Sequence, residues 1–346
     1  MTATIHTAPV VDRQSATRVV IDHLRPSPPG VEIIPCADDA LWRAARARDV
    51  TASAAAALIK DQDGAICHEW ETPFGLFQAK KGVATEGEET EPMRRGRLLE
   101  PVAVQVLRER HPDWMIRHNS GASRVYYRDP LARMGATPDV VADCPERGRG
   151  VVQIKSVEAS VFHRKWKIDG EVEPPTWIAI QAIIEASLTG AQWASVAPIV
   201  VGHGVDVPEI DIPIHFGIMA KLRKAVDEFW DRVERDEPYP PDYARDGALI
   251  ADIYADDNGD EIDLSGNARI VEIMRARDEL KSREADGADA GKQRKVYDAE
   301  IIHLLGNAAR GRLADGRVIE AKTVRRKAYS VAASSYRAVK VKEAKS

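Results

Sequence analysis

Residues 136–157 read ATPDVVADCPERGRGVVQIKSV and contain two short runs rich in β-forming residues. A charged, glycine-containing segment, residues 146–150, separates the runs where a hairpin turn is expected. Asp139 stands at the start of the first run. Gln153 and Lys155 alternate on the second run, so their side chains point to the same face of a strand. If the two strands pair through this turn, Asp139 meets the other two side chains at one end of a sheet.

The residue types at this predicted meeting point are those that phosphodiester hydrolysis uses. Upstream, the segment 93–111 is expected to be a helix, and it carries Glu100. Carboxylates supply the hard oxygen ligands that Mg²⁺ prefers, and a lysine beside the metal helps to orient and deprotonate a water. Taken alone, Asp139 after a proline is typical of a turn, and the pair Gln153 and Lys155 is typical of a solvated face. Their order and spacing favour a nuclease site.

The segments around the two strands predict an α/β core over residues 38–237. A further β-rich run, residues 122–130, precedes them. After them come an apolar helix over 176–190, a buried strand over 192–202 and a long amphipathic helix over 214–234. Alternation of helices and strands in this order is typical of an α/β fold.

Length and composition set limits on the class of protein. The chain has 346 residues, a length that suggests two domains, and 49 basic against 54 acidic residues give a net charge of −5. That balance excludes a generally polybasic protein but allows a local basic groove for DNA. The three cysteines, which lie far apart, exclude a disulfide framework. No segment approaches the roughly 18 apolar residues of a membrane span, so a cytoplasmic protein without a membrane partner is expected.

Composition also predicts where the parts of the chain begin and end. Proline-rich and charged segments border the α/β core, and the last part combines a charged helical hairpin with a basic run of β character. The predicted parts are an irregular N-terminal segment (1–37), the core (38–237), a linker (238–263), and a helical hairpin with a basic β-rich extension (264–346).

Several segments resemble the YqaJ-like viral recombinase family, to which the phage lambda-type exonucleases belong, within the PD-(D/E)xK nuclease superfamily. The resemblance covers residues 41–202, with a weaker similarity toward the C-terminus. The segments that carry it are LWRAARARDVTASAAAAL (41–58), TPFGLFQAKKG (72–82), RRGRLLEPVA (94–103), ATPDVVAD (136–143), VVQIKS (151–156) and WIAIQAIIEASLTG (177–190). The fold that this resemblance implies is a central mixed sheet flanked by helices.

The family resemblance implies a Mg²⁺-dependent exonuclease, with Mn²⁺ as an alternative ion. Such an enzyme degrades one strand of linear double-stranded DNA from the 5′ end and leaves a 3′ overhang for a single-strand annealing protein. The resemblance also implies a ring-shaped homotrimer around the DNA, in a phage-infected bacterial cell. By position in the motifs, the implied metal ligands are Glu100, Asp139, Gln153 and Ile154, and Lys155 would handle the attacking water.

Three further positions match family motifs. Gln181, on the predicted helix 176–190, would contact DNA or help to order the site. Arg46 and Ser53, seven residues apart, would hold the terminal 5′-phosphate. Arginine suits that role because its forked donors match the geometry of a phosphate group.

Two positions depart from the family pattern. The motif normally has a carboxylate where this chain has Gln153, and related nucleases often have tyrosine where this chain has Glu185. A Gln carbonyl can ligate Mg²⁺ but carries no charge. Two outcomes are open: weaker metal binding with activity retained, or a protein that binds DNA ends without cutting. Glu158, three residues beyond Lys155, is a candidate to compensate.

Other chemistries find little support. The chain has no G-x-G-x-x-G motif, no P-loop and no G-x-S-x-G motif, which argues against nucleotide-driven enzymes and serine hydrolases. None of the nine histidines has metal-ligand spacing, so packed or surface histidines are expected. A structure-specific endonuclease of the same fold remains a third alternative, because a fold alone does not determine function.

Overall fold

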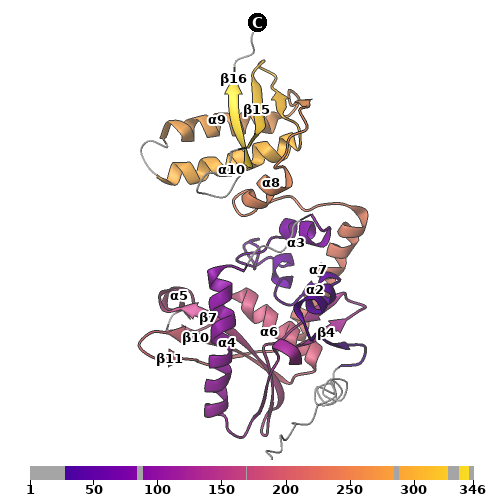
Figure 1. Cartoon of the computed structure of the whole chain (residues 1–346), viewed down its shortest axis with the longest axis vertical. Coiled ribbons are helices and arrows are strands. Elements are labelled where there is room, and N and C mark those ends of the chain that lie inside the picture. The colour runs from indigo at the N-terminus through magenta and orange to yellow at the C-terminus, as the bar shows by residue number, and fades with distance from the viewer. Residues whose placement is uncertain (1–27, 84–88, 169, 284–287, 326–334, 343–346) are drawn as a thin grey trace, which may run out of the picture. The chain divides into compact units, whose positions relative to one another are not determined.

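The computed structural model describes residues 28–83, 89–168, 170–283, 288–325 and 335–342. The chain divides into two compact units (Figure 1). The first comprises Met1–Glu71 and Gly87–Glu237, and the second comprises Thr72–Glu86 and Pro238–Ser346. The chain therefore enters the second unit twice.

A six-stranded mixed sheet forms the centre of the first unit. Its strands are β3 (Met115–His118), β6 (Val140–Cys144), β7 (Gly148–Glu158), β10 (Trp193–Val201), β11 (Val205–Asp206) and β12 (Ile210–Ile212). The strand order is β11-β10-β7-β6-β3, and β12 also pairs with β10. β7 runs parallel to β10 and antiparallel to β6. The sheet is mixed because helical connections join its parallel strands, whereas a short turn joins β6 to β7.

The hairpin expected within residues 136–157 is present. β6 and β7 pair in a register that sets Val140 opposite Val152. Asp139 immediately precedes β6, so it stands beside Gln153 at the end of this ladder. The alternation of side chains along β7 then carries Lys155 to the same face as Gln153.

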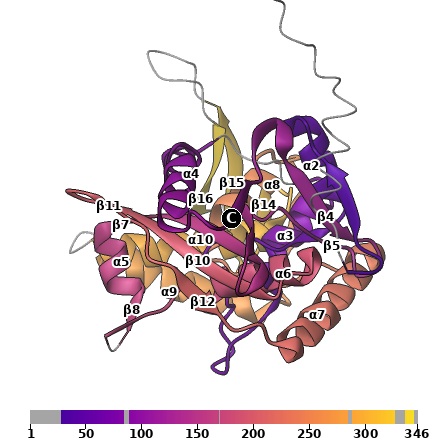
Figure 2. The same ribbon diagram turned by 90° about the horizontal axis from the view of Figure 1, so that it is seen from below.

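Two helices cover the two faces of this sheet (Figure 2). They are α4 (Glu91–Arg110) and α6 (Thr176–Thr189). The buried residues Val104 and Leu107 of α4 share a core cluster with Val152 and Ile154 of β7. α6 packs against β7 and β10 on the opposite face, toward which Lys155 points. The predicted site therefore lies between the sheet and α6.

The first unit contains a second, four-stranded sheet. The last of its strands in the sequence directly precedes β6. Its order is β1-β4-β5-β2, and its strands are β1 (Glu32–Pro35), β2 (Val50–Thr51), β4 (Val125–Asp129) and β5 (Met134–Ala136). Helix α2 (Asp39–Ala47) and the 3₁₀ turn η1 (Ala55–Leu58) flank β2 in sequence. β5 continues through Thr137 and Pro138 into Asp139, so the two sheets meet at the predicted site.

The other elements of the first unit are short, apart from one helix. They are η2 (Gly121–Ser123), α5 (Ala159–Lys165), β8 (Lys167–Ile168), β9 (Glu171–Val172) and α7 (Phe216–Arg235). α7 buries Leu222, Val226 and Phe229, which recur at helical spacing, and it exposes charged residues elsewhere. It corresponds to the amphipathic helix expected over 214–234.

The second unit combines helices with a small sheet. Its elements are α3 (Pro73–Lys80), α8 (Gly247–Ile253), β13 (Glu261–Asp263), α9 (Ala268–Arg283), α10 (Ala288–Leu305), β14 (Arg310–Arg312), β15 (Val318–Arg325) and β16 (Ser335–Lys342). The strands pair in the order β13-β14-β15-β16. Ile270 and Ile273 of α9, Ile301 of α10 and Ile319 of β15 are fully buried in one cluster.

Helix α3 belongs to this second unit although it lies early in the sequence. Phe74 packs in a cluster with Ile250 of α8 and Ile302 of α10. Thr72, which caps α3, donates a hydrogen bond of 2.6 Å from its hydroxyl to Asp246. Apolar packing and a buried hydrogen bond thus hold α3 among elements that follow it by more than half the chain.

The expected fold class is confirmed. A central mixed sheet flanked by helices is present, and residues 264–346 contain the helical hairpin α9–α10 followed by strands. Residues 1–27 of the expected irregular segment lie outside the described residues, whereas Glu32–Pro35 form β1, because this short run pairs with β4. The stretch expected to be a linker contains α8 and β13. None of the described helices is long and apolar enough to cross a membrane.

Candidate active site

The start of β6 and the middle of β7 bring three of the predicted metal ligands into contact. Asp139 Oδ2 accepts hydrogen bonds from Gln153 Nε2 at 2.5 Å and from the main-chain N–H of Ile154 at 2.8 Å. The Gln153 amide nitrogen also donates to the Ile154 carbonyl oxygen at 3.3 Å. The side-chain oxygen of Gln153, Oε1, is buried and has no hydrogen-bond partner among the described residues. The cluster therefore contains an unused buried acceptor.

Lys155 lies at one end of a chain of side chains that reaches into α6. Its Nζ donates to Gln181 Oε1 at 3.0 Å and lies 5.4 Å from the ring centre of Trp177. Gln181 Nε2 in turn donates to Glu185 Oε1 at 2.8 Å. Lysine can only donate, so the Gln181 amide must present its oxygen to Lys155 and its nitrogen to Glu185. The orientation of Gln181 is thus determined by its two neighbours.

Glu100 approaches the same edge of the sheet from α4. Its Oε1 lies 2.6 Å from Nε2 of His118, whose other ring nitrogen lies 3.2 Å from the Ser120 hydroxyl. His118 is the partner of Val140 in the β3–β6 ladder, one position from Asp139. Glu100 is close enough to Asp139 for its charge to act on the Asp139 carboxyl. The structure therefore brings Glu100, the second predicted carboxylate, to the site. There it contacts His118, which no sequence motif indicated.

Two carboxyl groups of the site hold their protons more tightly than usual. Burial, and then the charge of Glu100, raises the pKa of Asp139 to about 7, although Lys155 acts in the opposite direction. Burial, and then the charge of Asp139, raises the pKa of Glu185 well above its usual value. Interacting carboxyl groups with raised pKa values beside a lysine are typical of functional sites.

The donor set fits a hard divalent cation such as Mg²⁺. Asp139 and Glu100 supply carboxylate oxygens, and the buried Oε1 of Gln153 has no hydrogen-bond partner among the described residues. Within the described residues, no three side chains of His, Cys, Asp or Glu gather closely enough to hold an ion by themselves. That is compatible with Mg²⁺, which binds through one or two carboxylates and retains several waters. Because Gln153 presents its nitrogen to Asp139, its amide must turn over before its oxygen can serve as a ligand.

Arg46 is connected to the segment before the β6–β7 hairpin through Trp42. Its guanidinium lies 4.2 Å from the ring centre of Trp42, and that of Arg124 lies 4.6 Å from the same ring. The Trp42 indole N–H donates at 2.9 Å to the hydroxyl of Thr137, two residues before Asp139. Two guanidinium groups therefore gather on one aromatic ring that is tied to the segment leading into the site.

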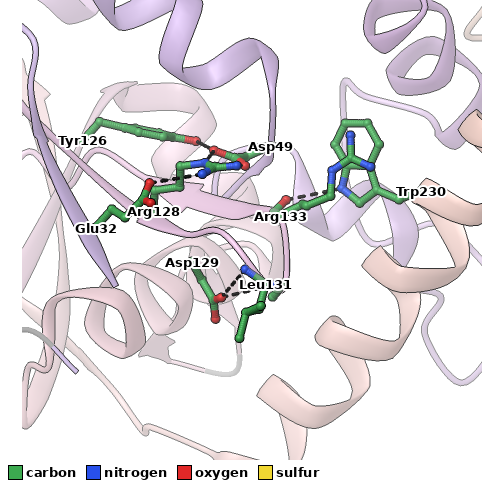
Figure 3. Close-up of polar contacts among 9 residues, drawn as sticks. Glu32, Asp49, Tyr126, Arg128, Asp129, Leu131, Arg133 and Trp230 are labelled. Carbon is green, nitrogen blue, oxygen red and sulfur yellow. Dashed lines mark hydrogen bonds and ion pairs between the residues drawn. The ribbon is translucent and has the colours of Figure 1, made fainter. Parts of the chain in front are cut away.

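A buried ion pair stabilises the turn between Arg46 and Ser53 (Figure 3). Asp49 is fully buried, and each of its carboxylate oxygens lies 3.0 Å from Nε of Arg128. The Tyr126 hydroxyl donates to the same carboxylate at 3.1 Å. A buried carboxylate is tolerated only where such partners replace water. The path of the chain from α2 into β2 and Ser53 is fixed by this network.

His68 joins the Ser53 segment to the Lys155 side of the site. Its Nδ1 accepts from the main-chain N–H groups of Trp70 at 3.0 Å and Glu71 at 2.8 Å. Nε2 must then carry the proton, which it donates to the Ser53 carbonyl oxygen at 2.9 Å. The ring also lies 5.0 Å from that of Trp177. His68 was expected to be a packed or surface histidine, and no spacing in the sequence indicates this connection.

Glu158 does not compensate for Gln153. It precedes α5 as its N-cap, and its carboxylate accepts from the main-chain N–H of Ser160 at 3.2 Å and from the Ser160 hydroxyl at 2.6 Å. Its side chain is exposed. The helix that starts there uses this carboxylate, so the charge missing at position 153 must come from elsewhere or be absent.

Comparison with solved structures finds distant similarities. An alkaline exonuclease from Laribacter hongkongensis (LHK-Exo) aligns with 57% of this chain and 93% of its own at 19% identity and a TM-score of 0.41. The same protein in complex with dAMP aligns over the same shares at 21% identity and a TM-score of 0.43. A SOX–DNA complex aligns with 66% of this chain and 73% of its own at 11% identity and a TM-score of 0.35.

Comparison at the level of sequence is more specific. No curated protein matches the chain. Residues 41–192 match the family of YqaJ-like viral recombinase domains. This range contains every predicted site residue, from Arg46 to Gln181, together with Glu185. The part of the chain that holds the candidate site is therefore similar to a YqaJ-like viral recombinase domain.

Proposed function

We propose that this protein is a metal-dependent exonuclease that acts on linear double-stranded DNA. The observation that carries the proposal is the contact of Asp139 with Gln153 and Ile154 at the hairpin, with Lys155 on the same face and Glu100 at the same edge. A viral recombinase domain acts on DNA, which supports the choice of substrate.

Each residue has a distinct part in the proposed mechanism. Asp139 and Glu100 would hold the cation, with the side-chain oxygen of Gln153 and the main-chain carbonyl of Ile154 as further ligands. Bound Mg²⁺ supplies a Lewis acid for the scissile phosphate and lowers the pKa of a bound water. Lys155 orients the attacking water and offsets the charge that develops on the phosphate.

The remaining motif residues extend the proposal to the DNA end. Gln181 fixes Lys155 through the hydrogen bond between them. Arg46 and Ser53 bind the terminal 5′-phosphate, which gives 5′-to-3′ degradation and leaves a 3′ overhang for a single-strand annealing protein. We further propose a homotrimer around the DNA in the cytoplasm of the host cell, with Mn²⁺ able to replace Mg²⁺.

A nuclease assay on linear, 5′-phosphorylated duplex DNA tests this function. Wild-type protein is expected to shorten the duplex only when Mg²⁺ is present, and Asp139→Ala is expected to reduce the rate to background. Asp143→Asn is the control, because Asp143 lies on β6, the strand that Asp139 precedes, but its carboxylate is bound by Arg117 and Arg149. Separate labels at the 5′ and 3′ ends report the polarity, and a circular duplex distinguishes an exonuclease from an endonuclease.

A second function, binding of DNA ends without cleavage, is favoured by the orientation of Gln153. Its amide nitrogen contacts both Asp139 and the Ile154 carbonyl, two groups that would otherwise face the cation. If wild-type protein binds ends but leaves the DNA intact, and Gln153→Glu gains cleavage, the binding function is correct and the exonuclease function is wrong.

A further inference from the structure

The site has a neutral residue at position 153 and an additional acidic residue at position 185. Gln153 stands where the family resemblance leads us to expect a carboxylate, and Glu185 stands where it leads us to expect a tyrosine. The two residues lie on different elements, β7 and α6, that pack against each other. The departures are therefore candidates for a single exchange of charge within one site.

Glu185 is fully buried, and Gln181 is the only partner that the described residues offer its carboxylate. Its side chain has no exposed surface, and only Oε1 has a hydrogen-bond partner, the amide of Gln181. Oε2 is buried and unpartnered among the described residues. A buried acid in this state lowers stability compared with an apolar residue of the same size. Packing alone thus gives no reason for a glutamate at this position.

Two neighbours of Glu185 favour its ionised form, although burial and the charge of Asp139 outweigh them and raise its pKa well above the usual value. Lys155 determines the orientation of Gln181, so the Gln181 amide can only donate to Glu185 and cannot accept a proton from it. A donor directed at a carboxylate favours the negative charge. The charge of Lys155 acts in the same direction, whereas the charge of Asp139 opposes it. Adding a cation near Asp139 would remove that opposition.

We propose that Glu185 supplies the negative charge that Gln153 lacks, so that Glu185 and Asp139 together bind the divalent cation of this site. The inference rests on the proposed metal-dependent function, but it concerns cation binding and not cleavage. It also explains why Glu158 is free to cap α5. In this arrangement the acidic ligand lies on helix α6 instead of on strand β7, against which α6 packs.

A double-mutant cycle on the full chain tests the exchange by calorimetric titration with Mg²⁺ and Mn²⁺ in the absence of DNA. Glu185→Gln is expected to weaken binding by about 10- to 100-fold, the range seen when supporting groups of metal sites are removed. Gln153→Glu in the Glu185→Gln background is expected to restore most of that loss. The effect of Glu185→Gln should therefore be large in the wild-type background and small in the Gln153→Glu background. Glu158→Gln is the matched control and should bind as wild type does.

Equal effects of Glu185→Gln in both backgrounds, or no effect in either, would overturn the inference. Thermal unfolding in EDTA checks that each variant folds, and Glu185→Asp, alone and combined with Gln153→Glu, replaces the pair if Glu185→Gln does not. DNA cleavage is measured separately. Wild-type protein that binds the ion but leaves DNA intact contradicts the proposed exonuclease alone, whereas active protein whose Glu185→Gln variant binds the ion normally contradicts this inference alone.

Discussion

Asp139 is placed so that its ionisation opposes folding when no cation is bound. Its pKa is raised from 3.8 to about 7 in the folded chain, mainly by burial. A folded state that holds a proton more tightly than the unfolded chain is stabilised at low pH. This stabilisation is fully present below the unfolded pKa of Asp139 and is lost as the pH rises through about 7.

Asp139→Asn is therefore expected to be more stable than wild type in EDTA, by a margin that grows as the pH rises from about 4 to 8. Asparagine keeps an oxygen for the two hydrogen bonds that Oδ2 accepts but cannot ionise. Chemical denaturation at several pH values measures the margin. A margin that stays constant over this range would show that ionisation of Asp139 does not oppose folding.

Asp143→Asn provides the control of opposite sign. Burial raises the pKa of Asp143, but hydrogen bonds and charges from Arg117 and Arg149 outweigh it and lower the pKa. This carboxylate contributes stability above its unfolded pKa and loses it as the pH falls through the folded pKa. The variant should be less stable than wild type near neutral pH, with a deficit that shrinks in acid.

Arg46 should discriminate between DNA ends. If it holds the terminal phosphate, Arg46→Ala reduces the preference for a 5′-phosphate over a 5′-hydroxyl end by about tenfold or more, because a charge-assisted contact is lost. Equilibrium binding to the two ends in Ca²⁺ or EDTA measures this preference. Arg43→Ala, an exposed change on the same helix, should leave it unchanged. If Arg46→Ala keeps the preference for a 5′-phosphate, residues other than Arg46 must bind the terminal phosphate.

At the scale of elements, the β6–β7 hairpin depends on close contact between neighbouring strands. Gly150 stands opposite Trp193 in the parallel β7–β10 ladder, and a Cβ at Gly150 would lie 2.0 Å from the Trp193 ring. The ring cannot move far, because its indole N–H donates to the Gly148 carbonyl at 3.1 Å. A glycine is therefore required at this position by close approach and not by its backbone angles.

Gly150→Ala is expected to lower the free energy of unfolding by about 1–3 kcal/mol, the usual range for an added methyl group in a packed core. Gly202→Ala, at the end of the neighbouring strand, has no atom within 4 Å of the new Cβ and is the matched control. Denaturant midpoints compare the two. Equal midpoints would mean that Trp193 moves aside freely.

The elements of the site were predictable where the pattern is local. Alternation along residues 150–157 and the turn before it predicted the hairpin, and with it the meeting of Asp139, Gln153 and Lys155. Gln181 and Glu185 are four residues apart on one helix and therefore share a face, as their hydrogen bond shows. Periodicity could not reveal that His68 reaches Ser53, or that Asp49 pairs with Arg128, since these contacts depend on how separate elements pack.

At the scale of the whole molecule, the chain builds its second unit from two distant segments. α3 lies inside the range that matches the recombinase domain, yet Phe74 packs with Ile250 and Ile302. No sequence pattern near α3 shows this, because an apolar helix face carries no information about which distant face covers it. The family match describes the sequence of α3, and the structure shows which unit it completes.

Phe74→Ala should destabilise the second unit selectively. Removing a buried phenylalanine costs about 3–5 kcal/mol. Hydrogen exchange is expected to accelerate in α10 and to stay unchanged in β6 and β7, which belong to the first unit. Val83→Ala, a change at an exposed position in the second unit, is the control. Acceleration in β6 and β7 as well would show that the two units unfold together.

The divided origin of the second unit also has a consequence for biosynthesis. At roughly 5–20 residues per second on the ribosome, the roughly 230 residues between Phe74 and Ile302 take on the order of 10 to 50 seconds to emerge. Throughout that interval the apolar side chains of α3 stay uncovered, because the helices that pack on them in the folded chain have not yet been synthesised. This helix is where a chaperone would be expected to bind the growing chain, and where a stalled or shortened translation product would aggregate.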